Sequence, residues 1–506
     1  MVIIFYTVIT GTVDGTRAHL VNAEVDCSRG MPYFSMVGML SSEVREAKER
    51  VRSAIKNSGY NLSPGRIIVN LSPGDIRKMG VHFDLPIAIA ILRAYDMIRD
   101  GNIKDSLFIG ELGLNGSIRP VSGILPIVIE AKNHGIHTCV VPVGNYSEAA
   151  CVDGMNIIAV NSLNETIDYI CSGQARERKV KKNYIIYDKC EYDFNEIHGQ
   201  DLAKRAIEIS VAGNHNILLN GQPGSGKSML AKRITGIMPE LTQKELLDIT
   251  SIYSIAGLLK DGCMIGGRPF REPHHTITMT GMTGGGSYPK PGETALANKG
   301  VLFLDELPEF SPQVLDTLRQ PLEEKKMVIT RNTGTYEFEC DFLFVAAMNP
   351  CKCGYYPDRE RCRCTEEEVR KYQSRVSGAI RDRIDICIDV HRVGYDELTD
   401  MKQGESSHTI KERVEQACER QIHRYRDIGI RYNSQLMPKD IARYCKISDK
   451  GERILKNAYE RLGVTSRGYY KILKIARTIA DLDESDEILV KHVEEAIVYR
   501  VFTGKE

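Results

Sequence analysis

The sequence predicts a mixed α/β fold in which a central parallel sheet is preceded by an α+β domain and followed by helices. Three observations support this prediction. Residues 217–220, 301–305 and 342–347 are short apolar runs, the pattern of parallel strands buried on both faces. A glycine-rich turn follows the first run directly, and a helical pattern follows the turn. From about residue 394 onward the chain is helical and charged.

Composition is that of an ordinary globular protein. The 506 residues suggest about three domains. Lys+Arg and Asp+Glu are equal at 67 each, so net charge neither favours nor excludes nucleic acid. No apolar run reaches about 18 residues, so we expect no membrane partner. Fourteen cysteines without a secretory leader favour reduced thiols and a cytoplasmic location.

Changes in composition along the chain give the expected domain boundaries. We expect an N-terminal α+β domain at 1–172, a linker at 173–190, the α/β core at 191–394 and a helical domain at 395–506. The linker is placed by the charged, apolar-poor segment 175–182. A contact between this basic segment and nucleic acid is the alternative that stays open.

In the first domain, strand patterns alternate with helical ones. Strands are expected at residues 1–10, 18–26, 66–71, 107–112 and 139–142. Helices are expected at residues 43–58, 85–94 and 125–133.

The glycine-rich turn has the pattern G-x-x-x-x-G-K-S. It consists of Gly221, Gln222, Pro223, Gly224, Ser225, Gly226, Lys227 and Ser228. Glycines let such a loop adopt positive φ and point its N–H groups at phosphates, and the following helix, 229–237, adds its positive N-terminal dipole. Lys227 is then expected to reach the β and γ oxygens of ATP, and the Ser228 hydroxyl to bind Mg²⁺.

Two further polar groups follow buried strands. Asp305 and Glu306 come directly after the run 301–304, where open α/β sheets bind ligands. Asp305 is expected to hold Mg²⁺ and Glu306 to activate the attacking water as general base. Asn349 ends the next strand, where its amide can bond the γ-phosphate and the water. The sequence therefore predicts ATP hydrolysis.

Four cysteines follow Asn349 in the pattern C-x-C-x₈-C-x-C. They are Cys351, Cys353, Cys362 and Cys364. Four thiolates bind Zn²⁺ tetrahedrally at about 2.3 Å, and a metal would hold together a short loop that has no core of its own. The pairs are one residue closer than in the usual zinc spacing, so four free thiols remain the alternative. We expect a structural Zn²⁺ whose role is remote from the hydrolysis chemistry.

Together with further blocks, these motifs resemble the YifB/ComM family of magnesium-chelatase-like AAA+ ATPases over nearly the whole chain. The blocks are residues 69–73, 83–86, 110–112, 119–121, 268–271, 273–275, 284–287, 300–310 and 476–481. The resemblance implies an AAA+ P-loop NTPase core with a helical lid. It also implies that the N-terminal domain is similar to the proteolytic domain of Lon, an S5-domain-2-like fold. Neither the serine near 79–82 nor the lysine near 124–127 of a protease dyad is present, so proteolysis is not expected.

The family resemblance also implies residue roles. Ile197 and Gly199 lie in a segment that would hold the adenine, and Asn349 would be sensor 1. Arg383 resembles an arginine finger that acts on a neighbour's ATP, and Arg467 resembles sensor 2. An ordinary surface ion pair is the alternative for each arginine. An arginine finger implies a homohexameric ring.

Three other features have less specific interpretations. The family's extra hairpin would be 328–338, with Arg331 as a phosphate contact or as part of a plain surface hairpin. Arginines at 411–426 would contact a nucleic-acid backbone or belong to a solvated helix of mixed charge. His274 and His275 are expected to position a loop, because no second ligand pair follows at metal-site spacing.

The expected function is a hexameric DNA motor that couples ATP hydrolysis to branch migration in recombination or natural transformation, with single-stranded or branched DNA as partner. The alternative is a magnesium-chelatase-type ATPase that remodels a protein partner.

Overall fold

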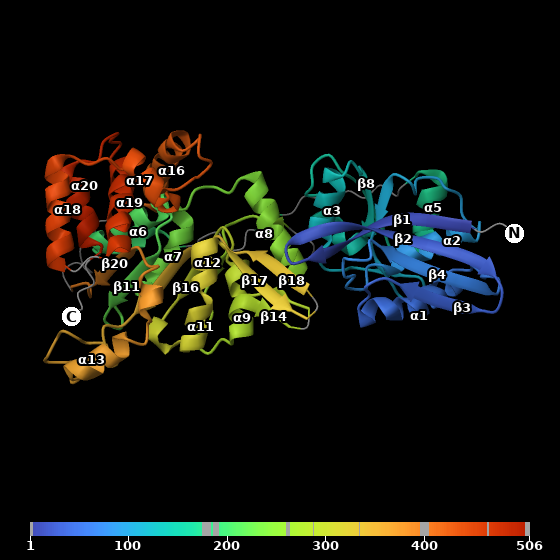
Figure 1. Ribbon diagram of the computed structural model, residues 1–506, viewed down its shortest axis with the longest axis horizontal. Coiled ribbons are helices and arrows are strands. Elements are labelled where there is room, and N and C mark those ends of the chain that lie inside the picture. Colours follow the sequence, from blue (N-terminus) through green and yellow to red (C-terminus); the bar gives the residue numbers. More distant parts are fainter. Residues whose placement is uncertain are drawn as a thin grey trace.

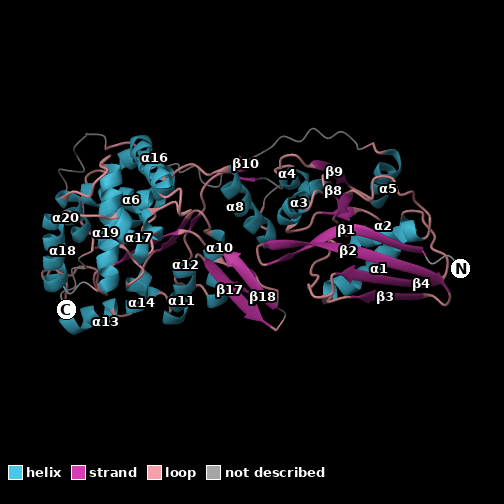
Figure 2. Ribbon diagram, turned by 45° about the horizontal axis from the view of Figure 1, so that its top comes forward, coloured by secondary structure: helices cyan, strands magenta, loops and turns pink. Residues whose placement is uncertain are grey.

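The computed structural model describes residues 4–174, 184–185, 192–259, 264–286, 288–332, 334–394, 404–462 and 465–500. The expected linker segment 175–182 and the boundary at 395 lie outside the described residues. The molecule is elongated, with the N-terminal domain at one end and the C-terminal helices at the other (Figure 1). Strands dominate the first part and helices the last (Figure 2). No described helix is both long and apolar enough to cross a membrane.

The N-terminal domain is a seven-stranded mixed sheet in the order β3-β4-β2-β1-β5-β8-β9. Its strands are β1 (Ile4–Asp14), β2 (Arg17–Arg29), β3 (Tyr33–Val37), β4 (Gly65–Ser72), β5 (Ser106–Phe108), β8 (Thr138–Pro142) and β9 (Asn156–Val160), with a ribbon of β6 (Glu111–Leu112) and β7 (Ile118–Arg119). Its helices are α1 (Ser42–Asn57), α2 (Asp84–Ala94), α3 (Ile124–Asn133), α4 (Tyr146–Ala149) and α5 (Leu163–Ser172). The α1 helix buries a stripe that recurs every three or four residues, as an amphipathic helix does.

One expectation in this domain was wrong. The strand expected at 107–112 is divided, because β5 ends at Phe108 and β6 begins at Glu111. Between them the chain turns toward α2, where the Leu85 N–H donates to the Gly110 carbonyl at 3.0 Å. A Cβ at Gly110 would lie 2.9 Å from Ile118, so the turn requires glycine.

The core is the expected parallel sheet, with five strands in the order β13-β16-β19-β11-β20. These are β11 (Ile217–Gly221), β13 (Phe270–Arg271), β16 (Val301–Leu304), β19 (Leu343–Met348) and β20 (Ile386–Val390). The core helices are α6 (Asp201–Gly213), α7 (Lys227–Ile237), α8 (Gln243–Ala256), α9 (Met279–Thr283), α10 (Glu293–Leu296), α11 (Pro312–Thr317), α12 (Arg319–Glu324), α13 (Glu366–Gln373) and α14 (Gly378–Arg381). Three small ribbons pair β10 (Tyr184–Ile185) with β12 (Met264–Ile265), β14 (Gly284–Gly285) with β15 (Lys290–Pro291), and β17 (Lys326–Arg331) with β18 (Gly334–Glu339).

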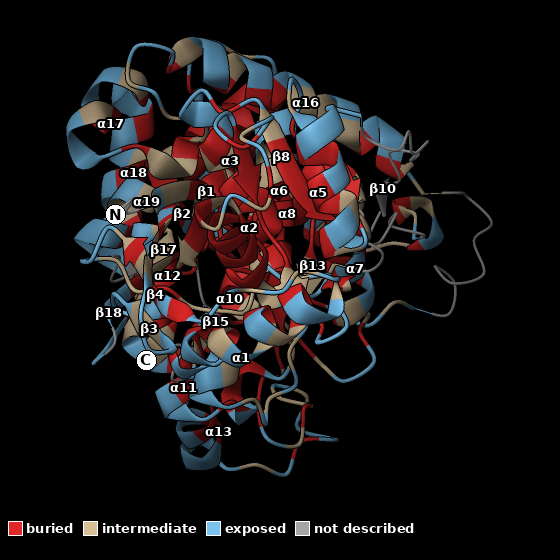
Figure 3. Ribbon diagram, turned by 90° about the vertical axis from the view of Figure 1, so that its right-hand side faces the viewer, coloured by how far each residue is buried: buried red, intermediate tan, exposed pale blue. Residues whose placement is uncertain are grey.

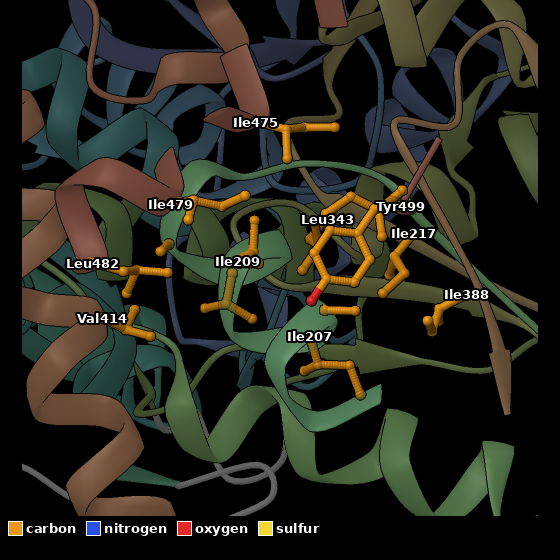
Figure 4. Packing of buried hydrophobic residues seen from close by; sticks show 14 of the residues in the cluster. Ile207, Ile209, Ile217, Leu343, Ile388, Val414, Ile475, Ile479, Leu482 and Tyr499 are labelled. Atoms are coloured by element: carbon orange, nitrogen blue, oxygen red, sulfur yellow. The ribbon is translucent and has the colours of Figure 1, made fainter. Parts of the chain in front are cut away.

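The C-terminal helices share a hydrophobic core with one face of this sheet. They are α16 (Ser407–Arg424), α17 (Pro438–Tyr444), α18 (Asp449–Leu462), α19 (Ser466–Leu482) and α20 (Val490–Val498). Val414 of α16 and Ile475 and Ile479 of α19 pack in one cluster with Ile209 of α6 and Ile217 of β11 (Figure 4). Viewed end on, buried residues fill the interior behind an exposed rim (Figure 3). The lid is therefore anchored to the sheet that carries the candidate site.

The N-terminal domain contacts the core through several segments, among them Arg77, whose guanidinium lies over the Tyr288 ring at 5.5 Å, and the two backbone contacts described next. At the β1–β2 turn, the Thr16 N–H donates to the Glu337 carbonyl of β18 at 3.0 Å. Near α8, the Gly123 N–H donates to the Ser254 carbonyl at 3.1 Å, and the Ser254 hydroxyl contacts the Glu148 carboxyl. Burial raises the pKa of Glu148. The second contact is thus a buried polar joint.

Candidate active site

The glycine-rich loop joins β11 to α7, as predicted. The loop's first residue, Gly221, pairs with Val390 at the carboxyl end of the sheet, and α7 begins at Lys227. Gly224 and Gly226 have φ of 76° and 90°, and no other atom lies within 4 Å of a Cβ built on either. The loop therefore presents open backbone at a helix N-terminus, which is a binding place for phosphate.

Lys227 and Asn349 meet inside this loop. The Lys227 Nζ donates to the carbonyls of Gly221 and Gln222 at 2.7 and 3.0 Å, and to Asn349 Oδ1 at 3.2 Å. Burial lowers the pKa of Lys227, and the charges of Asp305 and Glu306 oppose that shift. The fold thus brings the loop lysine and the amide after β19 to one point.

The two residues expected to hold Mg²⁺ are in direct contact. The Ser228 Oγ donates to Asp305 Oδ2 at 2.7 Å, and Asp305 Oδ1 accepts the Glu306 N–H at 2.8 Å. A hydroxyl and a carboxylate are hard oxygen donors, so this donor set fits Mg²⁺. Asp305 follows β16, which is separated from β11 only by β19.

Glu306 has a neighbour that the sequence did not reveal. Its backbone is left-handed, with φ of 52°, and its side chain is 55% exposed. The His275 Nδ1 lies 3.7 Å from Glu306 Oε2, and the His275 ring also meets Phe310 edge-on. The adjacent His274 instead bonds Thr276 through Nδ1 at 2.8 Å. The histidine pair was expected to position a loop; of the two, His275 is the one beside the predicted general base.

The predicted adenine segment reaches the glycine-rich loop. Ile197 is buried and Gly199 has φ of 59°. In the same segment, the Gln200 Nε2 donates to the Ser225 carbonyl at 3.3 Å and also contacts the His391 carbonyl. This places residues 197–200 against the loop, where a base attached to the phosphates would lie.

Arg383 stands at the opposite end of the sheet. The Asn216 Nδ2 donates to the Arg383 carbonyl at 2.9 Å, and Asn216 directly precedes β11, whereas the loop follows β11. A five-residue strand spans about 16 Å. The Arg383 guanidinium pairs with Glu323 at 2.5 Å and with the Ala379 carbonyl at 2.6 Å, leaving the side chain 14% exposed.

Arg467 is on the same side as Arg383. Its Nη1 lies 3.8 Å from Asp382 Oδ2, and its side chain is 65% exposed. One helical turn further along α19, the Lys471 Nζ donates to the carbonyls of Asp382 and Ile384. The structure therefore does not bring Arg383 or Arg467 to Lys227 of the same chain.

The four cysteines converge, as the zinc prediction requires. One sulfur from each of Cys351, Cys353, Cys362 and Cys364 lies within 4.8 Å of all the others. The Cys351 and Cys353 sulfurs are 3.3 Å apart. Four converging thiols fit a tetrahedral metal such as Zn²⁺. The segment Cys351–Cys364, here called the cysteine knuckle, packs against the glycine-rich loop, because a Cβ built on Gly354 would lie 2.5 Å from Pro223 Cδ.

The two basic features considered as nucleic-acid contacts, the arginines of α16 and Arg331, differ in their surroundings. The α16 arginines make ion pairs within the chain: Arg413 with Glu208 and Glu405, Arg420 with Asp486, and Arg424 with Asp481. These pairs favour the mixed-charge interpretation of that helix over a nucleic-acid contact. Arg331, in contrast, is exposed at the tip of β17. The predicted hairpin is present, although its turn residue Thr333 lies outside the described part of the chain.

This geometry defines a class: the protein is a P-loop ATPase built on a parallel sheet. Comparison with known families agrees. Residues 193–398 match "Magnesium chelatase, subunit ChlI", residues 23–145 match "Subunit ChlI of Mg-chelatase", and residues 404–500 match "Magnesium chelatase, subunit ChlI C-terminal".

Relatives similar along nearly the whole chain narrow the class. Competence protein ComM of Haemophilus influenzae is 39% identical, over 96% of this chain and 95% of its own. Uncharacterized protein YifB of Escherichia coli is 38% identical, also over 96% and 95%. A shorter stretch, 30% of the chain, is 29% identical to Lon protease 2 of Bacillus subtilis, covering 28% of that protein. The chain belongs to the YifB/ComM family of magnesium-chelatase-like AAA+ ATPases, which implies ATP and Mg²⁺ as cofactors.

Proposed function

We propose that this protein is a homohexameric ring motor that uses ATP hydrolysis to move DNA, promoting branch migration in recombination or natural transformation. One observation carries the proposal. Within one chain, the loop that contains Lys227 lies at one end of the parallel sheet, and Arg383 and Arg467 lie at the other end. A residue at the far end of the sheet acts on ATP only if it belongs to another copy. The name of the relative ComM, a competence protein, supports a role with DNA.

Within one chain, each polar group has a defined task. Lys227 exchanges its carbonyl partners for the β and γ oxygens of the triphosphate, and the loop N–H groups bind the remaining oxygens. Ser228 and Asp305 would hold Mg²⁺, which when bound would neutralise charge on those oxygens. Glu306 takes the proton of the attacking water, and Asn349 orients that water beside the γ-phosphate.

The arginines complete the site in trans. The Arg383 Nε is buried without a hydrogen-bond partner among the described residues, and its partner Glu323 is 52% exposed. A neighbour's γ-phosphate would replace Glu323 and satisfy the guanidinium as charge develops in the transition state. Arg467, exposed beside Asp382, would reach the same phosphate from the same side. This arrangement is a heterologous interface, which forms a ring when the rotation between neighbouring copies closes on itself; the proposal takes that closed form.

DNA contacts are proposed for the two hairpins of the core. A Cβ built on Gly285 of β14 lies 3.5 Å from Arg331 Nη2 of β17, so the tips of the two hairpins are neighbours. Arg331 and the exposed Lys290 of β15 supply cations for backbone phosphates. The second candidate, remodelling of a protein partner, is favoured by the family descriptions, all of which name a magnesium-chelatase subunit.

The decisive experiment measures the ATPase rate of the purified protein alone, with single-stranded DNA and with branched DNA. DNA is expected to bind and to stimulate the rate. If the protein hydrolyses ATP but does not bind DNA, and DNA does not raise the rate, only the protein-remodelling candidate remains. Lys227→Ala should abolish turnover, whereas Lys232→Ala, on the exposed face of the same helix, should not.

The cysteine knuckle is proposed to hold one structural Zn²⁺ through its four thiolates. Elemental analysis of protein kept reduced should find one zinc per chain. Loss of zinc is expected in a Cys351→Ser variant, because Cys351 is buried among the other three sulfurs. Metal-free reduced protein would contradict the assignment.

A further inference from the structure

The cysteine knuckle contacts the glycine-rich loop through Gly354. Any residue with a side chain at this position would displace either the knuckle or the loop. A Cβ built on Gly354 would lie 2.5 Å from Pro223 Cδ and 2.6 Å from Pro223 Cγ. Gly354 also has φ of 88°, a conformation that side chains disfavour. The backbone of Gly354 therefore lies directly against the proline ring at the crest of the loop.

The same segment reaches the loop at a second point. Asn349, two residues before Cys351, accepts a hydrogen bond from the Lys227 Nζ at 3.2 Å. The residue between them, Pro350, is fixed by Gln373 of α13, whose Nε2 donates to its carbonyl at 3.0 Å. The knuckle and Asn349 thus hold both ends of the loop, Pro223 near its start and Lys227 at its end.

The knuckle also forms a wall of a cavity beside the loop. This cavity of about 710 Å³ is lined by Gly221 and Gln222 of the loop, by Pro350, and by Tyr356 and Pro357 of the knuckle. Tyr356 is further held by Arg359, whose guanidinium stacks over its ring at 5.0 Å. A displacement of the knuckle would change the loop and this cavity together.

We infer that the cysteine knuckle is a positioning element of the nucleotide site, and that Gly354 is the residue through which it holds the loop in its binding conformation. The inference rests on the proposed ATP site, and it gives a positioning role to a segment whose metal was expected to have a role remote from hydrolysis. A phosphate-binding loop binds tightly only if its N–H groups are already arranged. The knuckle, in contact with Pro223 through Gly354, would keep these N–H groups in that arrangement.

The test compares Gly354→Ala with Gly378→Ala. Gly378, at the start of α14, has ordinary φ, and a Cβ there meets no atom within 4 Å, so it controls for the added methyl group alone. The measured quantity is the dissociation constant of a fluorescent ADP analogue with Mg²⁺. Gly354→Ala is expected to weaken binding about tenfold. Gly378→Ala should bind as the wild type does.

A second variant separates this contact from general damage to the knuckle. Pro223→Ala removes the Cγ and Cδ atoms that a Cβ at position 354 would strike. In the Pro223→Ala background, Gly354→Ala should therefore weaken binding much less than in the wild type. Equal binding by Gly354→Ala and wild type, or an undiminished defect in the double variant, would overturn the inference. Wild-type protein that binds no nucleotide would instead overturn the proposed function.

Discussion

At the scale of single residues, the site is held in place by its own polar groups. The Lys227 ammonium has three N–H donors, and all three have partners within the chain. Ser228 and Asp305 likewise satisfy each other. Lys227, Ser228 and Asp305 are therefore ordered before nucleotide arrives, so binding exchanges their partners and costs little further ordering.

His275 provides a prediction at this scale. Because its imidazole lies beside the Glu306 carboxylate, it restricts the orientations of the proposed general base. His275→Ala should lower kcat for ATP about tenfold and leave KM nearly unchanged, since phosphate binding does not involve Glu306. His274→Ala is the control, because His274 bonds Thr276 instead. Steady-state kinetics would contradict the role if the His275 variant kept the wild-type kcat.

The sequence predicted the local members of the site better than the distant ones. Lys227, Ser228 and Asp305 were predictable because each follows a buried strand, and parallel strands bring such ends together. The contact between His275 and Glu306 joins two segments that do not belong to one motif. No residue spacing in the sequence therefore predicts it. The burial of Arg383 against Glu323 was equally hidden, because a long-range ion pair leaves no periodic pattern.

At the scale of elements, the lid is joined to the core by a buried polar network. His215, after α6, bonds Thr478 of α19 through Nε2 at 2.8 Å, and Thr478 also accepts from Asn433. Asn433 in turn donates to Asp481, which pairs with Arg424 of α16. His215 is thus linked through Thr478 and Asn433 to the Asp481–Arg424 pair, which joins α6, α19 and α16 in one network. Burial lowers the pKa of His215 to about 4.

The lowered pKa makes this joint sensitive to acid. The unfolded chain takes up a proton on His215 below about pH 6.5, whereas the folded chain resists it. The neutral histidine therefore contributes its full stabilisation above about pH 6.5. As the pH falls toward 4, this contribution to the free energy of unfolding is lost, roughly 3 kcal/mol in total. The midpoint of urea unfolding should fall more steeply between pH 7 and 5 in the wild type than in His215→Asn. Parallel pH curves would show that this histidine does not titrate on unfolding.

Elements with a strong hydrophobic pattern were predicted, and weakly patterned ones were missed. The β11, β16 and β19 strands are central and buried on both faces, so their apolar runs are continuous. The edge strand β20 was missed because polar Asp389 interrupts it. In the fold, Asp389 accepts a hydrogen bond at 2.7 Å from Asn220 of the neighbouring strand β11. This partner is distant in the sequence, so no local pattern predicts it. β13 has only two residues, too few for any period.

The β1–β2 turn gives a further prediction at the scale of elements. Gly15 has φ of 63°, and a Cβ there would lie 2.4 Å from the Glu337 carbonyl of β18. Gly15→Ala should therefore push the N-terminal domain off the β17–β18 hairpin. Basal ATPase is expected to persist while stimulation by DNA falls several-fold, because the hairpin loses its support. Gly59→Ala, with φ of 95° and free space around it, is the control. Unchanged stimulation in Gly15→Ala would exclude this coupling.

At the scale of the whole molecule, the proposed function divides the hydrolysis site into two halves that one chain carries at separate places. The Lys227 half lies at the carboxyl ends of the strands, and the Arg383 half lies beyond their amino ends. Each half then meets the other only across an interface between copies. The ATPase rate per chain should therefore rise with protein concentration as the assembly forms.

Mixing two inactive variants tests this arrangement directly. Glu306→Gln lacks the proposed base but keeps Arg383, and Arg383→Ala keeps the base but lacks the finger. Each variant alone should be nearly inactive. In a random one-to-one mixture, about a quarter of the heterologous interfaces join an intact base to an intact arginine, so ATPase activity should reappear. A mixture of Glu306→Gln with Lys227→Ala is the control, because both defects lie in the same half and no interface is restored. If the first mixture stays as inactive as the control, Arg383 does not act across an interface, since only a trans contribution allows one chain to complete the other.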